Sequence, residues 1–122
     1  MQNPRRANGT RRNRDRARLM AEGRPCWICR AFGRSGVIDY DLPPGNPLAF
    51  EMDELVPISR GGAPTYDNAD AAHRCCNEWR GARSVDEVRR LGAEAQRRGG
   101  VGKGRPTGKG LPLPPGLAAP PR

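Results

Sequence analysis

The chain has little of the material from which a large hydrophobic core is built. Hydrophobic residues make up 35% of its 122 residues and aromatic residues only 5%, while 16 glycines and 13 prolines interrupt continuous helix or sheet. A typical globular chain carries a larger apolar share, so a large buried core is excluded. Because no apolar run approaches membrane-spanning length and none follows the Arg-rich N-terminus, we expect no membrane segment, no secretory signal and a cytoplasmic location.

Acidic residues are too scarce at both ends of the chain to balance the arginines there. The net charge of +9 divides into +6 for residues 1–24, −3 for residues 25–82 and +6 for residues 83–122. Basic arms suit a polyanion, because neutralising its phosphates releases counterions. An acidic centre facing the same polyanion makes sense mainly if it holds a cation. The alternative is that the arms only aid solubility, and that 20 Arg against 2 Lys reflects a GC-rich genome.

Composition and pattern divide the chain into one small domain and its appendages. Residues 1–24 are predicted to be a basic, largely disordered arm, whose second half becomes helical when docked on an anion. The domain covers residues 25–82, and a flanking helix covers residues 83–98. The Gly- and Pro-rich residues 99–122 are predicted to form a disordered tail.

Within the domain, the pattern predicts two strands followed by a helix. Alternating apolar residues favour a half-buried strand over residues 48–53. Pro and Gly then break residues 55–68 into a structured loop. A short second strand over residues 70–72 leads into a helix from residue 73 to about residue 83.

The flanking helix carries both a start and a stop signal. Ser84 and Glu87 match a capping box, and Gly99-Gly100 follows the last residues of a predicted helix over 85–98. The expected fold class is therefore α+β, a ββα unit with flanking helices.

Two pairs of metal-binding residues bracket the predicted strands. Cys26 and Cys29 form a C-x2-C pair, and His73 and Cys76 form an H-x2-C pair that begins after 43 intervening residues. Two such turns can each present two ligands to one tetrahedral Zn²⁺, with Cys75 as the competitor for the fourth position. Zinc would also stabilise so small a core, by about 10–16 kcal/mol in comparable peptides. A redox dithiol and incidental buried thiols are the alternatives, the first disfavoured because no βαβ pattern surrounds the pair.

Three acidic residues crowd together between these pairs. Glu51, Asp53 and Glu54 lie at the end of the first predicted strand, before a Gly-rich loop. They repel one another unless a cation is present, and hard oxygen ligands favour Mg²⁺, Mn²⁺ or Ca²⁺. The alternative is a solvated acidic turn, or one that is salt-bridged to Arg60 and Arg74.

These motifs together resemble the HNH endonuclease family, in particular the small stand-alone HNH proteins of bacteriophage genomes. The familiar pattern is a C-x2-C pair, then D-H-I-x-P-x-S-x-G-G, an Asn, and C-x2-C followed by His or Asn. This chain has C-W-I-C at 26–29, D-E-L-V-P-I-S-R-G-G at 53–62, Asn68, and H-R-C-C-N at 73–77. The resemblance covers residues 26–80, slightly under half of the chain.

The resemblance implies a zinc-stabilised ββα-metal domain, also called a His-Me finger, that hydrolyses or nicks DNA in a bacterial or phage-infected cell. It places Asp53 and Asn77 at the ligand positions for a catalytic Mg²⁺ or Mn²⁺, and Asn68 at the position that braces the loop and orients the general base. One metal would neutralise the scissile phosphate and the leaving oxygen while the base activates water. The implied structural zinc ligands are Cys26, Cys29, His73 and Cys76.

The main departure from the family pattern is Glu54, which stands where the family has its catalytic His. The only histidine of the chain, His73, aligns with a zinc ligand. Glu54 is then the general base itself, with a reference pKa of about 4.3 that makes it a weaker base than imidazole. The alternatives are that Glu54 is a second metal ligand beside Asp53, or that the site is inactive.

The expected partner is DNA, gripped through its backbone by the basic arms, with weak sequence preference. Candidate phosphate contacts are Arg60, Arg74 and Arg80. The alternative function is a catalytically inactive, zinc-dependent nucleic-acid-binding module, accessory to a phage packaging or replication complex. No membrane partner is expected.

Overall fold

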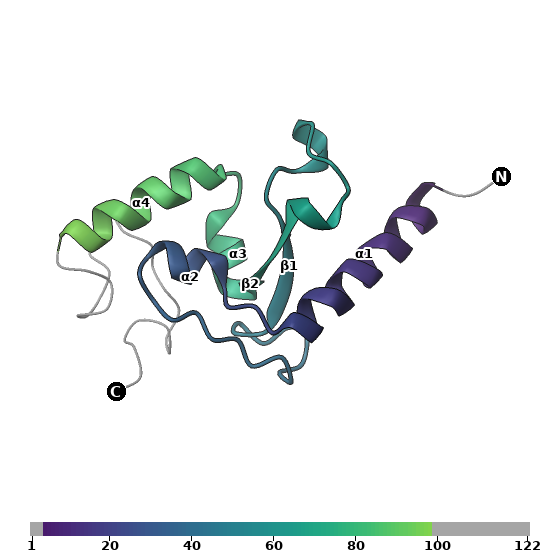
Figure 1. Ribbon diagram of the computed structural model, residues 1–122, viewed down its shortest axis with the longest axis horizontal. Helices are drawn as coiled ribbons and strands as arrows, with labels where there is room; N and C mark the ends of the chain where they lie inside the picture. Colours follow the sequence, from purple (N-terminus) through teal and green to yellow (C-terminus); the bar gives the residue numbers. More distant parts are fainter. Residues whose placement is uncertain (1–3, 99–122) are drawn as a thin grey trace.

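The computed structural model describes residues 4–98, so the predicted tail over residues 99–122 lies outside the described part. It is a small mixed α+β structure, as expected (Figure 1). The elements in chain order are helices α1 (Pro4–Glu22) and α2 (Trp27–Ala31), strand β1 (Phe50–Glu54), 3-10 turns η1 (Ile58–Arg60) and η2 (Tyr66–Asn68), strand β2 (Ala69–His73), and helices α3 (Arg74–Arg80) and α4 (Val85–Arg97).

The two strands pair antiparallel and lead directly into α3. Phe50 lies opposite His73, and Glu54 lies opposite Ala69. Both strands are close to the predicted ones, and the long connection between them contains the short turns η1 and η2. Because side chains alternate across a strand, Glu51 and Asp53 lie on one face of the sheet and Met52 and Glu54 on the other.

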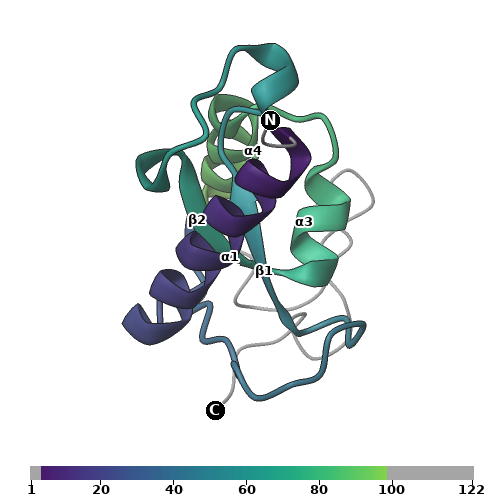
Figure 2. The same cartoon turned by 90° about the vertical axis from the view of Figure 1, so that its right-hand side faces the viewer.

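The N-terminal segment differs from its prediction, because most of it is the helix α1. This helix packs across the sheet (Figure 2). Leu19 is its fully buried anchor. The guanidinium of Arg16 lies 5.6 Å from the ring centre of Phe50, and that of Arg18 lies 3.8 Å from the ring centre of Tyr66. Arginine stems can cover apolar surface in this way, which a search for apolar periodicity does not detect.

The short helix α2, which the pattern did not predict, lies at the centre of the core. Ile28 and Phe32 are buried there. The ring of Phe32 packs edge to face against that of Trp79 in α3, with 5.8 Å between the ring centres. Helix α4 packs on α2, with Val88 fully buried, and its predicted cap is confirmed by the Ser84 hydroxyl, which accepts the Glu87 N–H at 3.1 Å.

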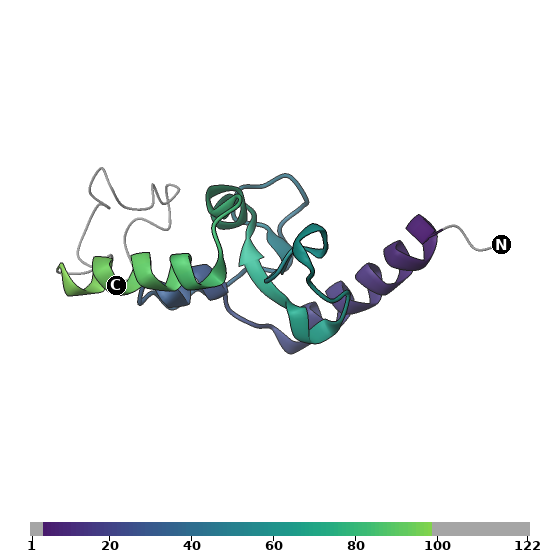
Figure 3. The same cartoon turned by 90° about the horizontal axis from the view of Figure 1, so that it is seen from above.

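The two long helices, the basic α1 and the charge-balanced α4, extend from opposite ends of the structure. Seen from above, α1 and α4 project to either side of the sheet (Figure 3). Within residues 4–98, each helix is too short or too polar to cross a membrane.

Candidate functional site

The four predicted zinc ligands lie together at one end of the sheet. Cys26 caps α2, Cys29 lies within α2, His73 ends β2, and Cys76 belongs to the first turn of α3. All four are buried, and their ligand atoms lie within 4.8 Å of one another. Cys75, the competitor, is only half-buried and stands outside this group. The cluster could therefore hold a structural metal ion such as zinc.

The separations among the ligand atoms of Cys29, His73 and Cys76 are close to the edges of a zinc tetrahedron. Cys29 Sγ lies 3.5 Å from His73 Nδ1 and 3.8 Å from Cys76 Sγ, and Cys76 Sγ lies 3.9 Å from His73 Nδ1. Bond lengths of about 2.3 Å to sulfur and 2.0 Å to nitrogen at tetrahedral angles require edges of about 3.5–3.8 Å. These three side chains are thus spaced as zinc requires, and Cys26 Sγ lies within 4.8 Å of their ligand atoms.

The other ring nitrogen of His73 also has the environment expected of a ligand. Nε2 lies 3.2 Å from the carbonyl oxygen of Val37. With Nδ1 directed at the metal, Nε2–H donates to that carbonyl, which holds the ring in the required tautomer and orientation. Gly36 brings this segment close, with a φ of +72° and its carbonyl oxygen accepting the Cys26 N–H at 2.8 Å.

Proton sharing within the cluster also prepares it for a cation. Burial opposes ionisation of Cys26, but hydrogen bonds from Cys29, Cys76 and His73 outweigh burial and lower the pKa of that thiol. The pKa values of Cys29 and Cys76 are raised, chiefly because their protons are held in hydrogen bonds with Cys26. One thiolate is therefore favoured in the protein without metal, and zinc binding must displace the remaining protons.

Arg34 supplies positive charge beside the cluster. Its side chain is buried, and burial lowers its pKa, while the charges of Cys29 and Cys76 act in the opposite direction. Zn²⁺ with three thiolates and a neutral imidazole carries a net charge of about −1. A buried negative charge needs a partner, so Arg34 is placed to offset it. The sequence pattern did not identify this residue.

Asp53, a predicted ligand of the catalytic metal, is held by protein groups. Its Oδ2 accepts hydrogen bonds from Trp27 Nε1 at 2.8 Å and from Arg80 Nη1 at 2.7 Å. Arg80 also donates to the carbonyls of Glu54 and Leu55. Burial raises the pKa of Asp53 in spite of these partners. Arg80, a predicted phosphate contact, is itself only 3% exposed, and in this structure its charge is used inside the domain.

Asn77 and Glu51 meet on the same side of the sheet as Asp53. Asn77 Nδ2 donates to Glu51 Oε1 at 3.0 Å, which leaves the Asn77 carbonyl oxygen as the available ligand atom. Arg74 lies near the same carboxylate, with Nε 3.7 Å from Glu51 Oε2 and 3.1 Å from Glu78 Oε1. Oxygen donors thus gather between β1 and the first turn of α3, and Arg74 is already engaged by acids.

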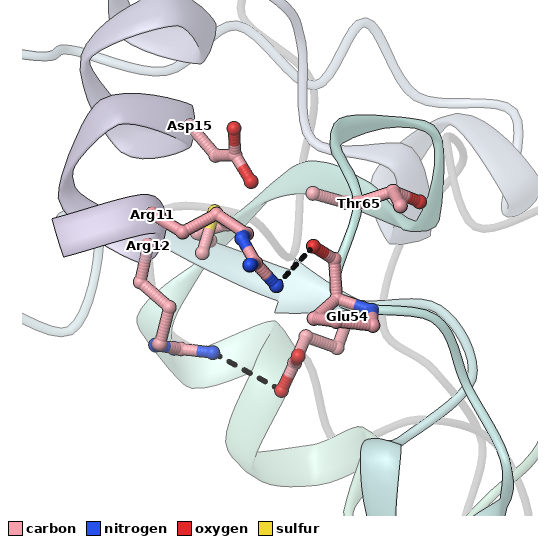
Figure 4. A pocket seen from close by; sticks show the side chains of 8 residues that line it. Arg11, Arg12, Asp15, Glu54 and Thr65 are labelled. Carbon is pink, nitrogen blue, oxygen red and sulfur yellow. Dashed lines mark hydrogen bonds and ion pairs between the residues drawn. The ribbon is translucent and has the colours of Figure 1, made fainter. Parts of the chain in front are cut away.

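Glu54 lies on the other face of the sheet, under α1. Its carboxylate forms an ion pair with Arg12 at 3.1 Å. Figure 4 shows this pair in a small pocket beside Asp15 and Thr65. Arg11 donates a hydrogen bond to the Pro64 carbonyl oxygen at 3.3 Å in the same pocket. Alternation along β1 therefore separates Glu54 from Asp53, and the structure does not bring the two carboxylates together as ligands of one metal.

Asn68 ties down the loop between the strands. Its Oδ1 accepts the Val56 N–H at 2.9 Å, and its Nδ2 donates to the carbonyls of Val56 at 2.7 Å and Ala63 at 2.9 Å. Arg60, at the loop tip, donates to the carbonyl of Ala82 at 3.0 Å. The residue expected to brace the loop is thus placed where it can do so.

Comparison with protein-family models, curated proteins and solved structures finds no match to this chain. The assignment of a function therefore depends on the motif pattern and on the geometry described above.

Proposed function

We propose that this chain is a divalent-metal-dependent DNA endonuclease of HNH type, built on a zinc-stabilised ββα unit. The observation that carries the proposal is the placement of Asp53 on β1 and Asn77 on α3 at the same side of the sheet. Asn77 directly follows Cys76 of the cluster suited to zinc. The HNH pattern requires this arrangement of its metal-binding carboxylate and its final His or Asn.

The side chains on this face support a site for a hard cation. Glu51, Asp53 and Asn77 supply carboxylate and amide oxygens, which Mg²⁺ and Mn²⁺ prefer. Trp27 and Arg80 both bond to Oδ2 of Asp53, an arrangement that orients a ligating carboxylate through its second oxygen. When bound, the metal would supply charge neutralisation at a phosphate.

Glu54 is not directed at the proposed metal site in this structure. Glu54 is 28% exposed and paired with Arg12. To accept a proton from water near Asp53, it would have to leave Arg12 and approach from the opposite face. In this proposal the attacking water therefore loses its proton to Glu54 after α1 and Arg12 have moved away, or to solvent, if a bound metal would lower the pKa of that water enough.

A second candidate is a DNA-binding module without catalysis. It is favoured by the ion pairs themselves, because Arg80 neutralises Asp53 and Arg12 neutralises Glu54. The zinc cluster and the basic helix α1 serve this function equally well. It predicts salt-sensitive DNA binding that does not depend on Mg²⁺ or Mn²⁺.

A plasmid-cleavage assay with Mg²⁺, Mn²⁺ or EDTA tests the proposal, with DNA binding measured on the same samples. Asn77→Ala should abolish or strongly reduce cleavage, while Glu78→Gln, which alters an exposed acid on α3, should not. Glu54→Gln distinguishes the two routes of water activation: it abolishes cleavage if Glu54 is the base and leaves it unchanged if no protein base is used. Asp53→Ala is included with a zinc measurement, because it disrupts a buried pair. If the wild type binds DNA without cleaving it, the second candidate is the function. If Glu54→His then gains cleavage, the metal site is intact and only the base is lacking.

A further inference from the structure

An arginine-lined recess lies outside the proposed metal site. It has a volume of about 420 Å³ and is bordered by the segment after α1, by α2, by α4 and by the sheet. Arg24, Arg30 and Arg89 contribute its positive charge, while Trp27 and Leu55 contribute apolar surface. Asp70 is the acid in its lining.

Close packing of α4 on α2 fixes the position of Arg89. Gly92 approaches α2 so closely that a Cβ atom there would lie 2.2 Å from the carbonyl oxygen of Ala31. Gln96 Nε2 donates to the same carbonyl at 2.9 Å. Arg89 lies three and seven residues before these contacts, on the same helical face. It is therefore held on the side of α4 that faces α2, which carries Arg30.

The charges of Arg30 and Arg89 are available to a ligand. Arg24 is engaged by Glu22 at 2.8 Å and by Asp70 at 3.6 Å, so the acid in the lining already has a partner. Arg30 and Arg89 are both exposed, and neither forms an ion pair with any residue of the described range 4–98. Two guanidinium groups from different helices thus border one recess without an acid to neutralise them.

We propose that Arg30 and Arg89 bind a backbone phosphate of DNA in this recess. The inference rests on the proposed function. Arg74 and Arg80, two of the predicted phosphate contacts, are engaged by acids of the domain, whereas Arg30 and Arg89 are free of them within residues 4–98. Guanidinium groups bind phosphate oxygens in pairs, and the apolar surface of Trp27 and Leu55 suits a sugar beside the phosphate. A free phosphate ion would use only the charged part of so large a recess, which favours the polymer.

The test measures binding of a labelled DNA duplex to the full-length, zinc-loaded protein by fluorescence anisotropy, over a range of salt concentrations. The variants are Arg30→Gln, Arg89→Gln and their combination. Arg90→Gln is the matched control, since it removes the same charge from the neighbouring position of α4, where Arg90 pairs with Glu94 at 3.1 Å. All these side chains are exposed, so folding is not at risk.

Arg30→Gln and Arg89→Gln should each weaken binding by about tenfold, and the double variant by less than the product, because both residues hold one phosphate. The plot of log affinity against log salt concentration has a negative slope, and its magnitude should decrease by about 0.9 in the double variant, the value for one phosphate contact. Equal effects of Arg89→Gln and Arg90→Gln would overturn the assignment. A second result would also overturn it: the variants bind DNA as tightly as the wild type, while millimolar inorganic phosphate binds at the recess of the wild type.

The outcome for the recess is separable from that for the proposed function. If the wild type binds and cleaves DNA but the two variants match the control, only the recess assignment fails. If the variants lose DNA binding while the wild type never cleaves, the recess stands and catalysis fails. A wild type that binds no DNA overturns both.

Discussion

Asp53 and Arg80 form a buried ion pair that joins β1 to α3, with 2.7 Å between Oδ2 and Nη1. Neither side chain is more than 8% exposed, and Trp27 donates a second hydrogen bond to the same oxygen. The pair therefore fixes the distance between the strand that carries the acidic cluster and the helix that carries Asn77. It connects the stability of the domain to the geometry of its candidate site.

Breaking this pair from one side should destabilise the fold strongly. Arg80→Met leaves the Asp53 carboxylate buried without a cation, at an expected cost of about 3–5 kcal/mol in the free energy of unfolding. Arg90→Met, which breaks an exposed pair, should cost no more than about 0.5 kcal/mol. Urea unfolding at constant zinc occupancy measures both. The double variant Asp53→Asn/Arg80→Met should recover part of the loss. If its loss of stability equals the sum of the losses in the two single variants, the two residues do not interact directly.

The pair also shows where sequence reasoning reached its limit. The spacing of Cys26, Cys29, His73 and Cys76 was sufficient to predict the metal cluster, because short turns determine the ligand positions locally. Alternation of apolar residues likewise predicted the first strand, and the short second strand before His73 was also predicted. The pattern could not predict that Arg80, at the end of a polar helix, would be buried. Arg80 pairs with Asp53, which lies 27 residues earlier in the sequence.

The same limit explains the other residues that the pattern missed. Val37 and Arg34 support the cluster from a segment with no motif of its own, and only the folded chain brings Val37 within 3.2 Å of His73. The segment of α1 was predicted to be largely disordered, with its second half helical only on an anion, because it contains almost nothing to bury. Within residues 9–22, where side chains are described, Leu19 is the one buried apolar residue of the helix. Its other contacts are made by arginines over Phe50 and Tyr66, which composition alone counts as solvent-exposed charge.

Metal content should depend on Cys76 and not on its neighbour Cys75. The two residues are adjacent, but only Cys76 lies in the cluster. Purified wild type and Cys75→Ser should each contain about one equivalent of zinc, and Cys76→Ser should contain little. Elemental analysis measures the metal, and thermal unfolding with and without a chelator measures its contribution to stability. Equal zinc loss in the two variants would exclude the proposed ligand set.

Zinc affinity should fall as the pH falls. Burial alone lowers the pKa of His73, but the hydrogen bond and negative charge of Cys26 outweigh it and raise that pKa. The imidazole therefore keeps its proton to a higher pH than a free histidine does, and zinc must displace that proton together with those of Cys29 and Cys76. Below the raised pKa of His73, binding should release about three protons. Titration calorimetry in two buffers of different ionisation enthalpy measures this number, and release of one proton or fewer would contradict the ligand set.

Arg34 should tune the affinity of the cluster without ligating the metal. Arg34→Met removes the positive charge beside Cys29 and Cys76, and a loss of about 10–100-fold in zinc affinity is expected, as for other groups that support ligands. Arg34→Lys should recover part of the loss. Arg30→Met, an exposed change on α2, serves as the control. Competition with a chelator measures affinity, and the spectrum of the Co²⁺-loaded variants should remain tetrahedral, because the four ligands are intact.

Two helical glycines should respond in opposite directions to the same substitution. A Cβ at Gly92 would lie 2.2 Å from the Ala31 carbonyl oxygen, so Gly92→Ala must push α4 away from α2. Overpacking of this kind costs about 1–3 kcal/mol. Gly9, within α1, has nothing within 4 Å of its Cβ position, and Gly9→Ala should stabilise the protein by about 0.5–1 kcal/mol through helix propensity. Denaturant unfolding of both variants decides the point. A stabilised Gly92→Ala protein would mean that α4 is not seated on α2, and Arg89 would then lose its fixed position beside Arg30.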